Sequence, residues 1–181
     1  MTADILSCNF FELFDIPVSY EIDIDLIQQR YRELQKVVHP DRFVNASDKE
    51  RRISMQQTSW INEALNTLRQ PVDRAIYLLK LKNVDLNLEN ETTMDAEFLM
   101  EQMEMREALS SISSKEDPIS ELDRFSAQIK SKMQSLIKGF AAAYENDQLD
   151  EAKEWIRKMQ FMQKARKEVD ELSAKIEDEL F

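Results

Sequence analysis

The chain contains a single glycine, Gly139, among its 181 residues. Phosphate-cradling loops, dinucleotide fingerprints and two-residue β-hairpins need glycine where the backbone must turn sharply or approach a ligand closely. The sequence therefore argues against nucleotide-binding folds and against an enzyme built on one. Gly139 lies inside a predicted helix, where glycine costs about 1 kcal/mol relative to alanine. Nothing in the sequence explains that position.

Cys8 is the only cysteine and His39 the only histidine. One copy of each cannot form a disulfide or a Cys/His zinc set, so we expect no metal site and no cofactor. The net charge of -11 disfavours nucleic acid and anionic lipid as partners. No apolar run approaches the roughly 20 residues that span a bilayer, and Asp4 lies where a signal peptide would be positive. These features predict a soluble, cytoplasmic protein.

In the first half of the chain, prolines separate the helical patterns. A short helix is expected over 10–14, and the next has Asp23 as its N-cap and ends before Pro40. A loop covers 39–46, and a capping box at 47–50 starts a third helix. A fourth helix follows Pro71 and ends near residue 82. The third helix is expected to bury Ile53, Trp60, Ile61, Ala64, Leu65 and Leu68.

Residues 83–93 read NVDLNLENETT and are predicted to link two domains, with Leu86 and Leu88 available for docking. The domains would be 1–82 and 94–181, and their charges differ. Residues 1–82 have a net charge of -1, whereas residues 83–181 have a net charge of -10. The two parts are therefore expected to recognise different partners.

The second half contains three helical patterns without strand alternation, over about 95–112, 118–144 and 150–181. Their apolar positions repeat every three or four residues, and short connections join them. This pattern predicts an antiparallel three-helix bundle, so that the whole chain is expected to be all-α.

The loop that follows the second helix contains the tripeptide His39-Pro40-Asp41. One reading is a helix-stopping turn, in which His39 caps the last carbonyls and Asp41 accepts backbone N–H groups. Against it stands the local charge, because residues 26–52 carry a net charge of +3 in an acidic protein. A basic stretch beside the only histidine suits docking onto an acidic protein surface.

A second candidate surface lies on the helix predicted over 95–112. On a helical wheel, Met105, Leu109 and Ile112 fall within about 40° of Phe98 and form a core stripe. Leu99, Met100 and Met103 fall about 100° to 200° away, beside Glu107. Phe161, in the last helix, also lies off its core stripe. Exposed apolar residues among charges mark interaction surfaces, although a wide bundle or the first domain could also cover this face.

Several segments resemble known sequences in order and spacing. The J domain is matched by Phe10–Phe14, Val37–Phe43, Ile61–Ala64, Leu68, Pro71, Arg74 and Tyr77. The HscB family, J-type co-chaperones of iron–sulfur cluster assembly, is matched further by Arg74–Leu81, Asp85–Leu86 and Phe98–Glu107. The chain resembles this family over essentially its whole length. It departs from the family at Asn83, where glycine is frequent, and it lacks the N-terminal cysteine pairs of animal members, as a bacterial-type member would.

The resemblance implies a J domain at 1–82 and a scaffold-binding bundle at 94–181. It implies a non-enzymatic co-chaperone that stimulates the ATPase of a DnaK-type chaperone of the HscA type and delivers the scaffold protein IscU to it. Chaperone binding would involve His39, Pro40, Asp41, Arg30, Arg32, Lys36 and Arg42. Scaffold binding would involve Leu99, Met100, Met103, Glu104, Arg106, Glu107 and Phe161.

Two other functions remain open from the sequence. A J-domain adaptor for the general DnaK chaperone with another client would need His39 but not Leu99 and Met103. A structural helical tether would need neither, and Asp41→Ala would then change no partner's activity. Cys8 is expected to be a buried, small apolar residue, since no neighbour in the sequence would lower its pKa.

Overall fold

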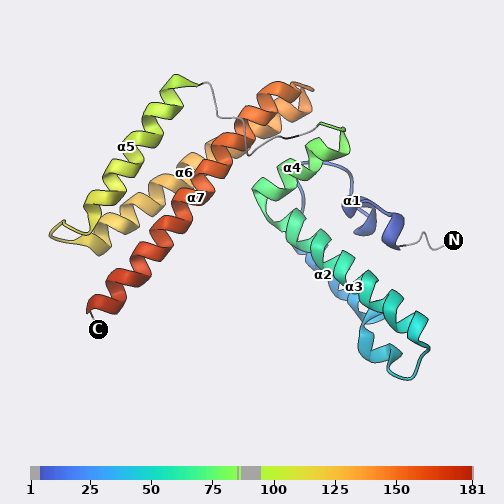
Figure 1. Cartoon of the computed structure of the whole chain (residues 1–181). Helices are drawn as coiled ribbons and strands as arrows, with labels where there is room; N and C mark the ends of the chain where they lie inside the picture. The colour runs from blue at the N-terminus through green and yellow to red at the C-terminus, as the bar shows by residue number, and fades with distance from the viewer. Residues whose placement is uncertain (1–4, 85, 87–94, 181) are drawn as a thin grey trace. The chain divides into compact units, whose positions relative to one another are not determined.

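The computed structural model describes residues 5–84, 86 and 95–180, with side chains described to residue 178. In these residues every regular element is a helix (Figure 1), as the sequence predicted. The chain divides into two compact units, residues 1–83 and 84–181. Most of the predicted 83–93 linker, including Leu88, lies outside the described residues. Among the described residues, each helix is either too short or too polar to span a bilayer.

The first unit is built around two antiparallel helices, α2 (Ile24–Val38) and α3 (Asp48–Arg69), which lie side by side in Figure 1. The short helices η1 (Ile5–Ser7) and α1 (Phe10–Leu13) pack on α3, and α4 (Pro71–Leu81) follows it directly. A further 3-10 turn, η2 (Pro40–Phe43), joins α2 to α3. The largest fully buried side chains of this unit are Phe11, Phe14, Ile27, Ile61, Leu68, Leu78 and Leu79.

The helix ends of this unit agree with the capping signals. Asp23 caps α2, and the Ser47–Glu50 capping box is formed at the start of α3. A second capping box, at Asn9, was not predicted from the sequence. Asn83 has a φ of 59°, in the left-handed region that glycine and asparagine tolerate best. The change from glycine to asparagine at this position is therefore compatible with the turn after α4.

Three expectations about burial in this unit are wrong. Ile53 is 38% exposed although the adjacent Ser54 is buried, because Ile53 lies about 80° around α3 from Ile61, at the edge of the buried stripe. Trp60 is only half-buried; its ring lies edge-on to Phe10, with the centroids 4.9 Å apart. Cys8 is half-exposed and not buried, since it lies between η1 and α1 and outside the core.

The second unit is an antiparallel arrangement of α5 (Ala96–Ile112), α6 (Pro118–Glu145) and α7 (Leu149–Leu180), shown in Figure 1. Helices α6 and α7 form the main hairpin and bury Ile129, Leu136, Phe140, Ile156 and Met159 completely. Helix α5 buries Phe98 and Ile112, each 3% exposed, near its two ends, and Met105 and Leu109 are half-buried between them. Most of its outer surface is therefore available to solvent.

Candidate interaction surfaces

The His39-Pro40-Asp41 loop is a tight turn whose polar side chains face solvent. His39 ends α2 and begins η2, so the chain changes direction at this residue. Its Nδ1 atom accepts a hydrogen bond from the Asp41 N–H at 3.3 Å and lies 3.5 Å from the Asp41 carboxylate. The side chains of His39 and Asp41 are 51% and 87% exposed. The His39 imidazole thus caps the N-terminus of η2, and the Asp41 carboxylate remains accessible to a partner.

The loop is fixed to α3 through the last residue of α2. The Val38 carbonyl accepts hydrogen bonds from the Ser54 hydroxyl at 2.5 Å and from the Thr58 hydroxyl at 3.4 Å. Ser54 is 1% exposed and Val38 is 2% exposed, so this hydrogen bond is shielded from solvent. Ser54 was not predicted from the sequence. A small hydroxyl residue on the buried face of α3 could have indicated a donor for the unpaired carbonyls at the end of α2. The Ser54–Val38 contact holds the residue immediately before His39.

The predicted basic residues divide into two groups. Arg32 and Lys36 are exposed and line a shallow hollow on α2 together with Tyr31 and His39. Arg42 folds back and donates a hydrogen bond to the Lys36 carbonyl at 2.5 Å. These cations and His39 therefore form one surface at the end of α2.

Arg30 differs from the other basic residues because its charge is already paired. Its guanidinium lies 3.3 Å from the Asp15 carboxylate and 3.7 Å from that of Glu33. Its Nε is buried without a hydrogen-bond partner. Arg30 is thus held against its own unit, and less of its charge is available for docking than that of Arg32 or Lys36.

The other side of the loop carries apolar surface that the sequence did not single out. Val44 and Met55 are each 62% exposed and share a hollow with Pro40 and Asp41. Arg51 and Arg52 lie at its edge. The acidic side chain of Asp41 is therefore flanked on one side by cations of α2 and on the other by apolar and basic residues of α3 and of the loop before it.

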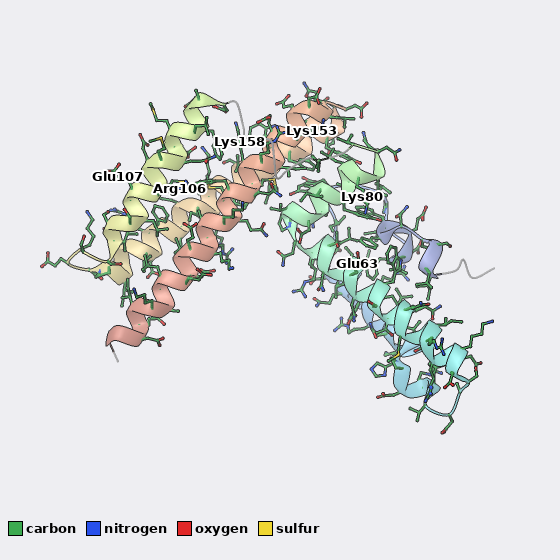
Figure 2. All side chains as sticks on the ribbon, in the orientation of Figure 1. Glu63, Lys80, Arg106, Glu107, Lys153 and Lys158 are labelled. Atoms are coloured by element: carbon green, nitrogen blue, oxygen red, sulfur yellow. The ribbon has the colours of Figure 1, made fainter. Side chains whose placement is uncertain are left out.

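The second candidate surface follows the outer face of α5. Met100 and Met103 are 66% and 72% exposed, and Leu99 is half-buried. Glu104, Arg106 and Glu107 are exposed among them, and Figure 2 labels Arg106 and Glu107 on this helix. The opposite face carries the core stripe, with Phe98 and Ile112 buried and Met105 and Leu109 half-buried. The helical wheel thus placed Met100 and Met103 correctly, whereas Leu99 is half-buried, as are Met105 and Leu109 of the core stripe.

Phe161 connects this face to α7. Its ring lies edge-on to Phe98, with the centroids 5.7 Å apart, and it is half-buried. The guanidinium of Arg106, a residue of α5, lies 6.0 Å from the centre of the Phe161 ring. The predicted scaffold-binding residues of α5 and of α7 therefore lie next to each other, at Arg106 and Phe161.

The start of α5 is held on α7 by a charged cluster that sequence reasoning missed. The Lys158 ammonium contacts the Asp95 carboxylate at 2.5 Å and lies 5.3 Å and 5.1 Å from the rings of Phe98 and Trp155. The hydrogen bond from Lys158, together with the Phe98 N–H, lowers the pKa of Asp95. Asp95 thus caps α5 and pairs with α7 at once. The Asp95–Lys158 contact spans 63 residues, a separation at which periodicity is uninformative.

The described residues offer no group of three or more His, Cys, Asp or Glu side chains that could hold a metal ion. The arrangement on both surfaces is instead one of exposed apolar residues beside charges, which is suited to binding proteins.

Comparisons with known proteins give a consistent result. Residues 94–170 match the family model described as the HSCB C-terminal oligomerisation domain. A co-chaperone protein HscB homolog from Shewanella halifaxensis is 43% identical over 180 residues, covering 96% of this chain and 99% of that protein. The structure of chaperone HscB from Vibrio cholerae is 37% identical with a TM-score of 0.84, covering 96% of this chain and 100% of that one. The crystal structure of human co-chaperone protein HscB is 30% identical with a TM-score of 0.84, covering 91% of this chain and 81% of that one.

Proposed function

Because this chain belongs to the HscB family of co-chaperones, we propose that it couples a DnaK-type ATPase chaperone to an iron–sulfur scaffold protein. The first unit would act as a J domain that stimulates ATP hydrolysis by a chaperone of the HscA type. The second unit would bind a scaffold protein of the IscU type and deliver it to that chaperone. The chain itself is not an enzyme, since its relatives are named co-chaperones.

The chaperone-binding role is assigned to the surface around His39. Asp41 presents an exposed carboxylate, and Arg32, Lys36 and Arg42 supply positive charge on one side of it. Arg30 would contribute less to this attraction than the other cations, since its guanidinium is already paired with Asp15. An exposed set of cations accelerates association with an acidic partner and fixes its orientation.

Stimulation of hydrolysis would follow from differential binding. A partner accelerates a reaction when it binds the transition state, or the conformation that leads to it, more tightly than the resting state. His39, Pro40 and Asp41 need only contact the hydrolysis-competent state of the chaperone more favourably than the other states. No side chain of this chain has to take part in the chemistry.

The scaffold-binding role is assigned to the outer face of α5 with Phe161. Leu99, Met100 and Met103 supply the apolar contact, and methionine adapts well to irregular partner surfaces. Charged residues surround these side chains and would give orientation: Glu104, Arg106 and Glu107. One observation carries this assignment, namely that Met100 and Met103 are 66% and 72% exposed on a helix whose opposite face is packed.

Steady-state ATP hydrolysis by the HscA-type chaperone, measured with and without IscU, tests the scaffold role. The wild-type protein is expected to stimulate hydrolysis further when IscU is added. A Leu99→Ala/Met103→Ala/Phe161→Ala variant should lose that scaffold-dependent part and keep the rest. Ile119→Ala is the matched control, because Ile119 is an apolar residue of the same unit that is 39% exposed on α6. Equal responses of the triple variant and the control would overturn the assignment.

A further inference from the structure

A small pocket opens beside the α5 surface, where α5, α6 and α7 meet. Its volume is about 40 Å³. A water-sized group needs roughly 10–15 Å³ by the same measure, so the pocket has room for about three such groups, the size of a branched aliphatic end. The floor is apolar and is formed by Met105, Leu109, Phe125, Phe161 and Ala165. Phe125 and Ala165 are 8% and 6% exposed, so this floor is part of the packed interior.

The mouth of the pocket is charged, with more positive than negative groups. Arg106 and Lys164 lie on it with Glu168, and all three are exposed. Within the described part of the chain, neither cation forms an ion pair, whereas the neighbouring Arg166 and Lys167 pair with Asp170 and Glu171. The Arg106 guanidinium lies 6.0 Å from the centre of the Phe161 ring, which forms part of the floor. Two cations are thus available beside an apolar cavity.

The pocket is continuous with the surface assigned to the scaffold protein, because Arg106 and Phe161 belong to both. We propose, resting on that assignment, that the pocket receives an aliphatic side chain of the scaffold protein whose neighbouring carboxylate pairs with Arg106 and Lys164. Apolar burial would supply affinity, and the charge pair would select an aliphatic residue that is next to an acidic one. Met105, Leu109 and Lys164 would then take part in recognition, although none of them belongs to the exposed apolar face of α5.

Two variants test the pocket separately. Ala165→Leu fills the cavity from its floor with a residue that favours helix, and Lys164→Glu reverses one charge at the mouth. Arg166→Glu is the matched control, because it makes the same change in charge about 200° around α7 from Lys164. Circular dichroism and thermal melting of each full-length variant establish that it is folded. Lys164→Glu is an exposed substitution that leaves the packing of the unit unchanged, so it keeps the test decisive if Ala165→Leu perturbs folding.

Binding of purified IscU is measured by isothermal titration. Lys164→Glu and Ala165→Leu are each expected to raise Kd by about tenfold, and Arg166→Glu by less than about twofold. Wild-type affinity in Lys164→Glu, with weakened binding in Leu99→Ala/Met103→Ala, would overturn the pocket and leave the scaffold-binding surface standing. Equal losses in Lys164→Glu and Arg166→Glu would also overturn it, since general electrostatics would then account for both. Absence of binding by the wild-type protein would overturn the pocket and the proposed function together.

Discussion

The Trp155 indole lies directly against the backbone of Gly139. A methyl group at position 139 would come within 2.7 Å of the Trp155 Cε2 atom and within 2.8 Å of Cδ2 and Cζ2. Distances below 3.0 Å between such atoms are not tolerated, and the neighbouring contacts of Trp155 with Lys158 and Glu151 restrict movement of the ring. The only glycine of the chain therefore serves close packing of α6 against α7, and it does not mark a turn.

Gly139→Ala is expected to destabilise the second unit, although alanine favours helix by about 1 kcal/mol. Overpacking of a well-packed contact costs about 1–3 kcal/mol, so the net loss should be about 1 kcal/mol. Urea denaturation of the full chain measures it. The control is the same Gly139→Ala change made in a Trp155→Ala variant. There it should be stabilising, because the indole ring that a methyl group would contact is absent. Destabilisation of equal size in both backgrounds would contradict the packing explanation.

Ser54→Ala is expected to weaken both the stability of the first unit and its stimulation of the chaperone. The change removes the donor at 2.5 Å from the buried Val38 carbonyl and leaves only the longer contact from Thr58. Loss of one buried hydrogen bond costs about 1–3 kcal/mol. Thermal denaturation measures the first effect. The chaperone concentration at half-maximal stimulation measures the second, which follows because Val38 directly precedes His39.

The pairing of Asp95 with Lys158 should make the attachment of α5 depend on pH. Hydrogen bonds from Lys158 and the Phe98 N–H hold the pKa of Asp95 below its ordinary value of 3.8. A lowered pKa in the folded protein means that the contribution is complete above the ordinary value and is lost as pH falls through the lowered one. We therefore expect wild-type stability to decrease on acidification by more than that of Asp95→Asn, which keeps a capping side chain.

Urea midpoints measured between about pH 6 and pH 2 check this expectation. Trp155 fluorescence in a Trp60→Phe background reports the second unit, where Asp95 lies. The difference in stability between wild type and Asp95→Asn should be largest at the higher pH and should shrink on acidification. A difference that does not change with pH would contradict this expectation, because the negative charge of Asp95 would then contribute nothing that the Asn side chain does not.

Docking of the first unit should depend on salt and on the cations at the end of α2. Lys36→Glu is expected to raise the concentration of co-chaperone needed for half-maximal ATPase stimulation by about tenfold at low salt, and by less at high salt, because ions screen exposed charges. Lys80→Glu is the matched control, since Lys80 is an exposed cation on α4 (Figure 2). Similar effects of the two changes would assign the salt dependence to net charge and not to a docking surface.

The sequence predicted those features that depend on neighbouring residues. The end of α2 before Pro40 and the capping box at Ser47 follow from local backbone chemistry, and both are present. The two faces of α5 follow from helical periodicity in the same way. These features need only residues within about four helical turns of each other.

Features that join distant segments could not be predicted from one sequence. The Asp95–Lys158 pair and the contact of Gly139 with Trp155 each connect two helices whose rotation about their axes is set by packing. Ile53 was misplaced in the core because its spacing fits the edge of the apolar stripe, yet it is 38% exposed although the adjacent Ser54 is buried. Periodicity gives the centre of the buried face of a helix, but the width of that face depends on the elements that pack against it.

The central claim is that His39 and Asp41 act on the chaperone from an exposed turn, without any chemistry of their own. Single-turnover ATP hydrolysis by the HscA-type chaperone, with the full-length protein in excess, tests it most directly. Wild type is expected to accelerate hydrolysis, whereas His39→Gln should lose at least about tenfold of that acceleration and still bind IscU with wild-type affinity. Acceleration by His39→Gln equal to that of wild type would contradict the account, because the turn would then be only a connection between α2 and α3.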